Sequence, residues 1–195
     1  MIVNIFWPDF SNPFQYWCLT NNIPFAIVQN WPLLLYALIL AVISLKDIKR
    51  IEAKEIVFVQ DIYKSVMAGV LEEIGYRCLF IFTAMIPIAI INFVTMGLVM
   101  WLYNAIMFPI VNIVTLGLIS GTIWGFPALF IAGAISANAT FRDGHKYQGI
   151  FGYINAWFVG FYILHIMLTQ GLLIAILVHI IYDLIFAFVR YWGQS

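Results

Sequence analysis

The feature that most constrains this chain is a long apolar stretch, from Ser65 to Phe141, that contains only three charged residues. Glu72, Glu73 and Arg77 lie there among Leu, Ile, Val, Phe and Met side chains. A charge at mid-membrane depth costs at least ~2.5–3.5 kcal/mol on insertion scales, so such residues usually face the protein interior and serve its function. We therefore expect these three side chains to mark a functional site.

The composition predicts an integral membrane protein. Hydrophobic residues make up 64% of the 195 residues and charged residues 9%, compared with roughly 25% charged residues in a soluble domain. About 20 apolar residues cross a bilayer core, which predicts an all-α, polytopic bundle of six or seven transmembrane spans. The apolar segments are residues 27–45, 65–86, 88–103, 106–122, 124–141, 149–168 and 171–190. The formal net charge is zero and the sequence has no basic patch, so the lipid bilayer and not nucleic acid is the expected partner.

The chain divides into two parts at residue 65. Residues 1–64 combine an N-terminal stretch rich in Trp, Phe and Pro, suited to the membrane interface, with a first span and an amphipathic segment. Lys46 to Lys64 holds five of the nine Lys and Arg residues, so the positive-inside rule places it in the cytoplasm. Counting alternate crossings then puts the N-terminus outside, and the C-terminus and the loop at 142–146 inside.

Local breaks and cysteines complete this organisation. Pro87 predicts a break between the second and third segments, and the stretch 121–127 predicts a later break or kink. Cys18 and Cys78 form no CxxC pair, and we expect two buried free thiols. No internal repeat is detected.

The three charges of the apolar stretch have different expected partners. Glu73 and Arg77 are four residues apart, so they share a helix face and can pair. Glu72 points about 100° away and has no partner on its own helix. A desolvated carboxylate of this kind can serve as a general base. A purely structural Glu73–Arg77 ion pair is the alternative interpretation.

The remaining polar residues gather at one predicted depth. His145 lies where the fifth segment returns to the cytoplasm, and His179 and Asp183, four residues apart, share a face of the last segment. The predicted topology places Glu72, His145 and Asp183 near the cytoplasmic ends of three helices, with His179 one turn deeper. His165 is predicted to lie toward the opposite side of the membrane from these residues. Each residue alone is compatible with a packing role, but together they predict a single polar pocket.

At these positions the sequence resembles the CAAX protease and bacteriocin-processing family of intramembrane proteases, also called the Abi family. The EExxxR motif of that family is matched by Glu72–Arg77, and its HxxxD motif by His179–Asp183. Its FxxxH motif is matched by Phe141–His145, which we prefer, or by Phe161–His165. The resemblance covers about residues 65–186.

The resemblance implies an endopeptidase of the prokaryotic plasma membrane. Its catalytic core would lie in residues 65–195, and its substrate would be a membrane-associated peptide or protein. The placement of the Lys and Arg residues predicts separately that the site faces the cytoplasm. Glu72 and His145 would activate a water molecule, while Glu73 and Arg77 would hold the site together. His179 and Asp183 would stabilise the oxyanion or position the groups that do so.

The sequence is compatible with a metal-dependent site and with a metal-independent one. Glu72, His145 and His179 are a candidate zinc set, because two His and a carboxylate are common zinc ligands, but the sequence has no HExxH motif. The resemblance is compatible with a glutamate-dependent protease and with a metalloprotease. Two other functions are also compatible with intramembrane charges: a non-catalytic scaffold or bacteriocin-immunity protein, and an ion or proton transporter. The absence of a detected repeat argues against the transporter.

Overall fold

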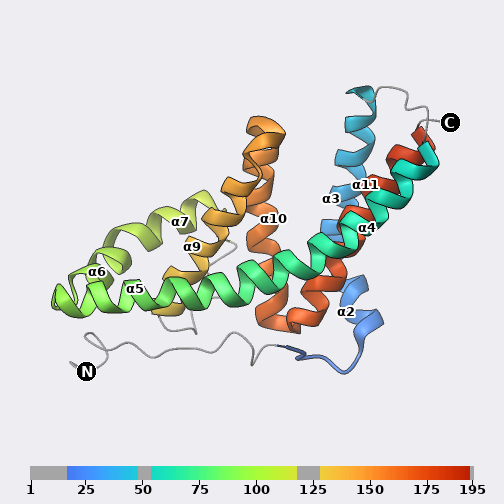
Figure 1. Ribbon diagram of the computed structural model, residues 1–195. Coiled ribbons are helices and arrows are strands. Elements are labelled where there is room, and N and C mark those ends of the chain that lie inside the picture. Colours follow the sequence, from blue (N-terminus) through green and yellow to red (C-terminus); the bar gives the residue numbers. More distant parts are fainter. Residues whose placement is uncertain (1–16, 48–53, 118–127, 194–195) are drawn as a thin grey trace.

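The computed structural model in Figure 1 describes residues 17–47, 54–117 and 128–193, and every regular element within these ranges is a helix. The all-α prediction is confirmed for this part of the chain. The interfacial segment predicted at the N-terminus lies mostly outside the described residues. The elements are α2 (Ile23–Gln29), α3 (Trp31–Ser44), η2 (Leu45–Asp47), α4 (Lys54–Glu72), η3 (Glu73–Leu79), α5 (Phe80–Val94), α6 (Leu98–Leu102), η4 (Tyr103–Met107), α7 (Phe108–Val114), α9 (Ala128–Gly144), η5 (Lys146–Gln148), α10 (Gly149–Gln170) and α11 (Leu172–Gly193).

The structure has fewer candidate spans than predicted. Three helices in the described ranges are long and apolar enough to cross a membrane, and a fourth candidate is the pair α2 and α3, bent by 56°. The three are Lys54–Val94, Lys146–Gln170 and Leu172–Gly193. A shorter apolar helix covers Leu98–Val114. Six to seven spans are therefore not confirmed, although the apolar helices agree with an integral membrane protein.

The predicted break at Pro87 is wrong. Pro87 lies inside α5, and α4, η3 and α5 continue as one helix of 41 residues. Membrane helices tolerate an internal Pro because neighbouring groups can satisfy the freed backbone carbonyl. The same helix includes most of the predicted amphipathic segment, because α4 begins at Lys54. The domain boundary predicted at residue 65 therefore falls inside α4. The break predicted at 121–127 lies outside the described residues.

The chain turns back at Thr95–Gly97 instead, and a second turn of the same construction follows at Thr115–Gly117. In the first turn the Gly97 N–H donates to Asn92 O at 2.8 Å, and in the second the Gly117 N–H donates to Asn112 O at 2.9 Å. Both turns read Asn-x-Val-Thr-x-Gly-Leu in the sequence. This short local repeat corrects the expectation of no internal repeat, and it encodes a helix C-terminus.

α11 organises the half of the molecule that carries the polar residues. It packs antiparallel against α4 and also contacts α3 and α10, while α5 packs against α9 (Figure 1). Gly69 lies at the α4–α11 contact, where a Cβ atom would be 2.5 Å from Ile180 Cγ1 and 3.1 Å from Ile180 N. Small residues allow membrane helices to approach this closely. Gly69 thereby brings the following turn of α4, with Glu72, against α11.

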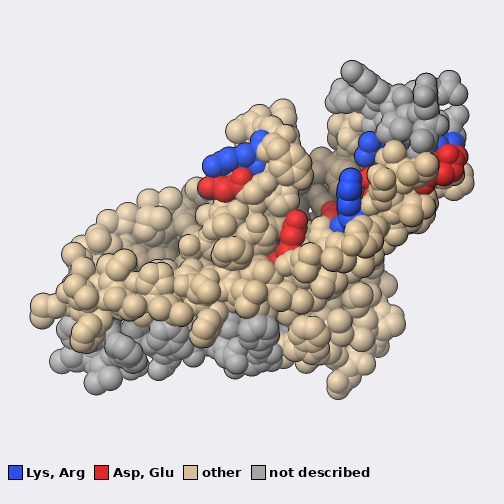
Figure 2. Space-filling view, viewed as in Figure 1, with Lys and Arg blue, Asp and Glu red and all other residues tan. Residues whose placement is uncertain are grey.

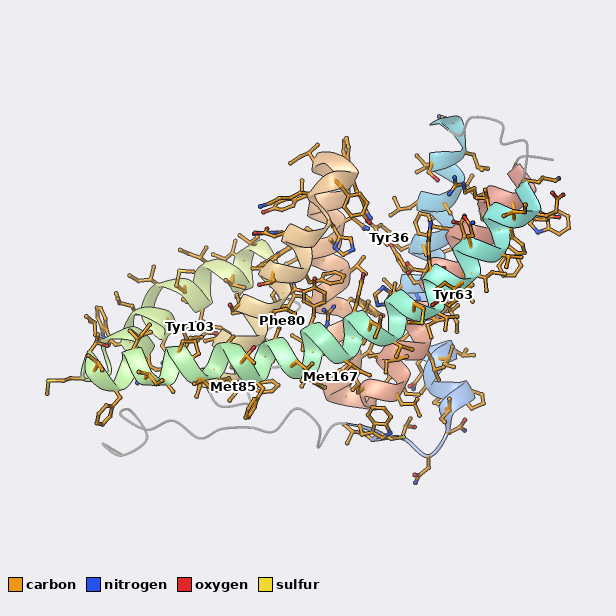
Figure 3. All side chains as sticks on the ribbon, viewed as in Figure 1. Tyr36, Tyr63, Phe80, Met85, Tyr103 and Met167 are labelled. Atoms are coloured by element: carbon orange, nitrogen blue, oxygen red, sulfur yellow. The ribbon has the colours of Figure 1, made fainter. Side chains whose placement is uncertain are left out.

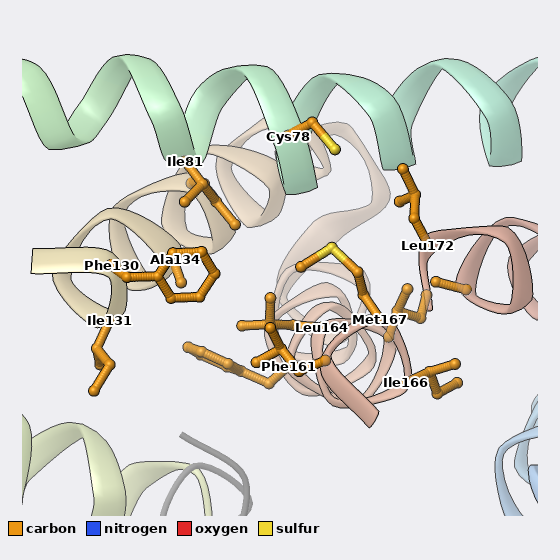
Figure 4. Close-up of a cluster of buried hydrophobic side chains, with 14 of the residues drawn as sticks. Cys78, Ile81, Phe130, Ile131, Ala134, Phe161, Leu164, Ile166, Met167 and Leu172 are labelled. Carbon is orange, nitrogen blue, oxygen red and sulfur yellow. The ribbon is translucent and has the colours of Figure 1, made fainter. Parts of the chain in front are cut away.

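A buried apolar cluster holds the other helices together. Figure 4 shows side chains from the long helix, α9, α10 and α11 meeting, among them Ile81, Phe130, Leu164, Met167 and Leu172. These five side chains are at most 2% exposed. Close packing of this kind fixes the relative positions of the helices. The polar site is therefore built on elements that a common core holds in place.

The turn between α10 and α11 receives the N-terminal part of the described chain. Gly171 has φ +106°, and a Cβ atom there would lie 2.8 Å from Cys18 Cα, so the turn requires glycine. The Leu19 N–H donates to Gln170 O at 3.2 Å, and the Leu173 N–H donates to Trp17 O at 2.9 Å. Cys18 is exposed here and Cys78 is buried, so the prediction of two buried thiols is wrong for Cys18.

Charged side chains gather toward one end of the molecule. In Figure 2 the Lys, Arg, Asp and Glu side chains lie in the upper part of the view, and the lower part shows none. The start of α4, the end of α9 and the end of α11 all lie on this side (Figure 1). Lys54, Arg142 and Arg190 are thus on the same side of the helix bundle, as their predicted topology requires.

Candidate active site

A cavity of about 650 Å³ opens near the charged end, between α4, α11 and the connection from α9 to α10. Glu72, His145, His179 and Asp183 all line it. The structure therefore brings together four of the six predicted site residues. The other two, Glu73 and Arg77, lie behind this lining and are 0% and 2% exposed.

A π-helix separates the two adjacent glutamates. α4 ends at Glu72, and η3 begins at Glu73 as a π-helix, closed by a hydrogen bond from the Phe80 N–H to the Gly75 carbonyl five residues earlier. Such wide turns are rare and are frequent at functional sites. Glu72 remains 30% exposed toward the cavity, while Glu73 is fully buried. The local sequence carries no signal for the wider turn, and it predicts a regular α-helix here.

The shortest polar contact of Glu73 is with His179, not with Arg77. Glu73 Oε1 lies 2.7 Å from His179 Nδ1, whereas Arg77 Nε lies 3.4 Å from Glu73 Oε2 and does not form a hydrogen bond with it. The predicted Glu73–Arg77 ion pair is present, but Glu73 also accepts a hydrogen bond from His179 on α11. One buried carboxylate thus links the π-helix to the helix that carries His179.

Arg77 connects the π-helix to α9 and α10. Its Nη2 donates to the carbonyl of Gly160 at 3.1 Å, and its guanidinium lies 4.6 Å from the centroid of the Phe141 ring. A guanidinium over an aromatic face gains cation–π attraction, which is larger in a desolvated setting. Arg77 is therefore held from three sides and supports the site from within the protein.

The ring of His179 is oriented by Glu73. Because Glu73 accepts the hydrogen bond, Nδ1 is assigned as protonated, and Nε2 faces the cavity. Nε2 lies 3.9 Å from Glu72 Oε2 and 3.8 Å from Asp183 Oδ2. Both distances are too long for hydrogen bonds. Asp183 therefore adds negative charge near Nε2 but does not orient the ring.

His145 is oriented by the backbone of its own helix. Its Nδ1 lies 2.7 Å from the carbonyl oxygen of Phe141, so this nitrogen donates and Nε2 is left as an acceptor. The Phe141 ring packs on the imidazole with a centroid distance of 4.5 Å. Phe141 thus contacts both His145 and Arg77, which gives the phenylalanine of the FxxxH motif a physical role.

His165, the alternative histidine, lies elsewhere. It is half-buried on α10 next to Tyr162, with ring centroids 6.3 Å apart, and it is not among the residues that line the cavity. Its position agrees with the predicted separation from the other two histidines.

Ion pairs join the helices around the cavity. Arg190 Nη1 lies 3.2 Å from Asp61 Oδ2 and links α11 to α4. Asp143 accepts hydrogen bonds from Arg142 at 2.8 Å and from the Tyr153 hydroxyl at 3.0 Å, and Lys146 Nζ lies 3.3 Å from it. The hydrogen bond from Arg142 is the main cause that lowers the pKa of the exposed Asp143 carboxyl. These pairs connect the end of α9 to the start of α10 beside His145.

The candidate zinc ligands do not form a metal site in this arrangement. Within the described ranges, no group of three or more His, Cys, Asp or Glu side chains is placed so that it could hold a metal ion. Glu72, His145 and His179 share the cavity but do not form a ligand cluster.

Comparison of the chain with protein-family models, with curated proteins and with solved structures found no match. The resemblance to the CAAX protease and bacteriocin-processing family therefore rests on the three motifs and on the positions of their residues.

Proposed function

We propose that this chain is an intramembrane endopeptidase that hydrolyses a peptide bond of a membrane-associated protein or peptide. The observation that supports this most directly is the shared cavity of Glu72, His145, His179 and Asp183. In that cavity the partly exposed Glu72 carboxylate lies 3.9 Å from Nε2 of His179, and His145 lines the same cavity. The Nδ1 atoms of the two imidazoles are already engaged, by Glu73 and by the Phe141 carbonyl. A histidine that acts as a general acid or base needs a positioned ring with one nitrogen free to exchange a proton with the reacting group.

In the proposed mechanism, Glu72 takes a proton from a water molecule that also donates a hydrogen bond to Nε2 of His145, and the oxygen of this water attacks the carbonyl carbon of the substrate. The proton is then delivered to the leaving amine as the carbon–nitrogen bond breaks. The separations of 3.9 and 3.8 Å between His179 Nε2 and the carboxylates of Glu72 and Asp183 suit a water molecule placed between them.

His179 has a separate role in this proposal. With Nδ1 donating to Glu73, the ring must carry a second proton on Nε2 to donate to the developing oxyanion. Glu73, Glu72 and Asp183 surround the ring and stabilise that positive charge by coulombic attraction. Fixed donors in a desolvated site stabilise a transition state without reorganisation at the moment of reaction.

The location of the site is part of the proposal. The charged end of the molecule would face the cytoplasm of a prokaryotic cell, because Lys and Arg are enriched in cytoplasmic loops. Water would then reach Glu72 from that side, and the surrounding apolar helices would separate the cavity from lipid.

The test is proteolysis by the purified protein. A library of synthetic transmembrane peptides is reconstituted with the protein in liposomes, and new peptide termini are identified by mass spectrometry. We expect cleavage by the parent protein and a loss of at least ~100-fold in the Glu72→Gln variant, because the change removes a base and keeps the shape. Glu55→Gln, on the exposed first turn of α4, is the matched control and should cleave normally.

The outcomes separate the alternatives. If Glu72→Gln cleaves as fast as the parent protein, Glu72 does not activate the water. If the folded parent protein cleaves none of the peptides, the non-catalytic scaffold or immunity protein and the transporter become the better hypotheses. Cleavage that persists after treatment with a chelator supports the glutamate-dependent form, and cleavage restored only by added zinc supports a metalloprotease.

A further inference from the structure

A second cavity, of about 550 Å³, adjoins the polar cavity. The two share four lining residues, Ser44, Gln148, Asp183 and Phe186. The second cavity lies between α3 and α10, and α11 contributes Tyr182 and Phe186 to its wall. α3 and α10 stand apart in Figure 1, since α3 packs mainly on α11.

A smaller cavity of about 170 Å³ continues the same space. It shares Tyr36 and Phe158 with the second cavity and reaches Pro32 at the beginning of α3. The second and third cavities together form a crevice along α3 and α10, here called the α3–α10 crevice. One end of it meets the site at Asp183, and its walls are mostly apolar, with Leu40, Phe151, Ile154 and Phe158 among them.

A row of hydrogen bonds crosses this crevice. The Tyr36 hydroxyl on α3 donates to Asn155 Oδ1 on α10 at 2.8 Å, and Asn155 Nδ2 donates to the Tyr182 hydroxyl on α11 at 3.2 Å. Figure 3 labels Tyr36, which projects from α3 toward α10. Tyr36 is 41% exposed and Tyr182 is 6% exposed, so the bridge runs from the outer side of the crevice to its buried side on α11.

We propose that the α3–α10 crevice binds an extended apolar stretch of the substrate polypeptide, on one side of the bond that is cleaved, and that the Tyr36–Asn155 hydrogen bond is the latch that such a segment opens. This inference rests on the proposed peptidase function. α3 lies outside the part of the chain that carries the three motifs, so the crevice adds an element that those motifs do not specify.

The size of the crevice suits a short extended segment. In the larger of the two cavities that form the crevice, Tyr36 and Ser44 are eight residues apart on α3, about 12 Å along the helix axis. An extended chain rises about 3.3 Å per residue, so about four residues cover this distance. The segment would lie with its apolar side chains against Phe151, Ile154 and Phe158 and would place the next peptide bond beside Asp183, where the polar cavity with Glu72 begins.

The polar groups of the crevice explain why the segment is extended and not helical. A helix satisfies its own backbone N–H and C=O groups, whereas an unwound segment at membrane depth must find partners in the protein. Asn155 can make four hydrogen bonds and uses two in the bridge, which leaves one N–H and one lone pair for a peptide group. Gln148 supplies a second amide where the crevice meets the polar cavity.

The experiment measures binding without cleavage. Phe158 is replaced by photoreactive benzoylphenylalanine in the Glu72→Gln variant, and Phe93, 56% exposed on α5, is replaced in a control protein. The probes are two synthetic peptides of about 24 Leu and Ala residues, long enough to span a bilayer, of which one has a central Gly-Pro-Gly break that prevents a continuous helix. After illumination in liposomes, the labelled protein is quantified by mass spectrometry.

We expect the interrupted peptide to label position 158 several-fold more than the continuous peptide, and both peptides to label position 93 equally. Equal labelling of position 158 by the two peptides would overturn the crevice as a site for an extended segment. Tyr36→Phe removes the latch and should raise labelling at 158 about fivefold, the effect of losing one net hydrogen bond. Tyr63→Phe, on the exposed face of α4, is the control and should change nothing. Unchanged labelling in Tyr36→Phe would overturn the latch.

These outcomes are independent of the peptidase test. If labelling at 158 is selective but the parent protein cleaves no peptide, the crevice is retained and the peptidase function fails. If the parent protein cleaves the interrupted peptide but position 158 is not labelled, the peptidase function is retained and the crevice is overturned.

Discussion

His179 Nδ1 and Glu73 Oε1 lie 2.7 Å apart, although 106 residues separate them in the chain. Glu73 is fully buried, and Arg77 approaches its other oxygen at 3.4 Å. The two neighbouring glutamates therefore have different positions, with Glu72 at the cavity and Glu73 behind it. The π-helix that begins at Glu73 is what separates them.

The first prediction concerns the stability provided by Glu73. Glu73→Gln should lower the free energy of unfolding by ~3–5 kcal/mol, because Arg77 would be left buried without a counter-charge. Chemical unfolding in detergent, followed by circular dichroism, measures the change. Glu55→Gln on the exposed first turn of α4 controls for the loss of a carboxylate. A Glu73→Gln variant as stable as this control would contradict a structural role for the buried pair.

The second prediction separates the three histidines. His145→Ala and His179→Ala should each lower the rate of peptide cleavage by at least ~100-fold, the low end for general acid–base groups. His165→Ala should remain within a few-fold of the parent protein, because His165 does not line the cavity. Single-turnover assays on the cleaved peptide measure these rates. An inactive His165→Ala variant together with an active His145→Ala variant would move the FxxxH motif to Phe161–His165.

The third prediction concerns the close contact between α4 and α11. Gly69→Ala should lower the free energy of unfolding by ~1–3 kcal/mol, the usual cost of overpacking, because its Cβ would meet Ile180 at 2.5 Å. Cleavage should also slow, since α4 carries Glu72 toward His179. In Gly75→Ala the new Cβ meets nothing within 4 Å, so this control should be neutral or slightly more stable. If the two variants are equally stable, the α4–α11 contact can widen to accept the added Cβ without a loss of unfolding free energy.

The fourth prediction concerns the orientation in the membrane. Cys18 is exposed beside the α10–α11 turn, and Tyr147 is 80% exposed at the opposite, charged end. An impermeant maleimide added to intact cells should label Cys18, whereas a cysteine at position 147 should react only after lysis. Cys78 is buried and should stay silent in the parent protein. If position 147 reacts in intact cells and Cys18 reacts only after lysis, the orientation in the membrane is the opposite of the predicted one. If both positions react from the same side, the predicted topology is wrong.

The span prediction shows where local sequence patterns stop being informative. Hydropathy detects apolar segments but not whether two of them continue into one another, so Lys54–Val94 was divided at Pro87. The real turn at Thr95–Gly97 depends on a C-cap formed by Asn92 and Gly97, which a search for Pro residues does not detect. The same limitation hid the start of the π-helix between Glu72 and Glu73.

The sequence by itself was sufficient for the helical class and for the apolar character of the segments. Those properties follow from local quantities: the transfer cost of side chains and the 3.6-residue spacing of a helix. The prediction that Glu72, His145, His179 and Asp183 share one pocket is confirmed, but it rested on a count of membrane crossings that is not itself confirmed. The partner of Glu73, the contact at Gly69 and the crevice bridged by Tyr36 and Asn155 became visible only in the folded chain. Each depends on the distance between atoms of helices that are far apart in the sequence, and that distance is set by the packing of the whole bundle.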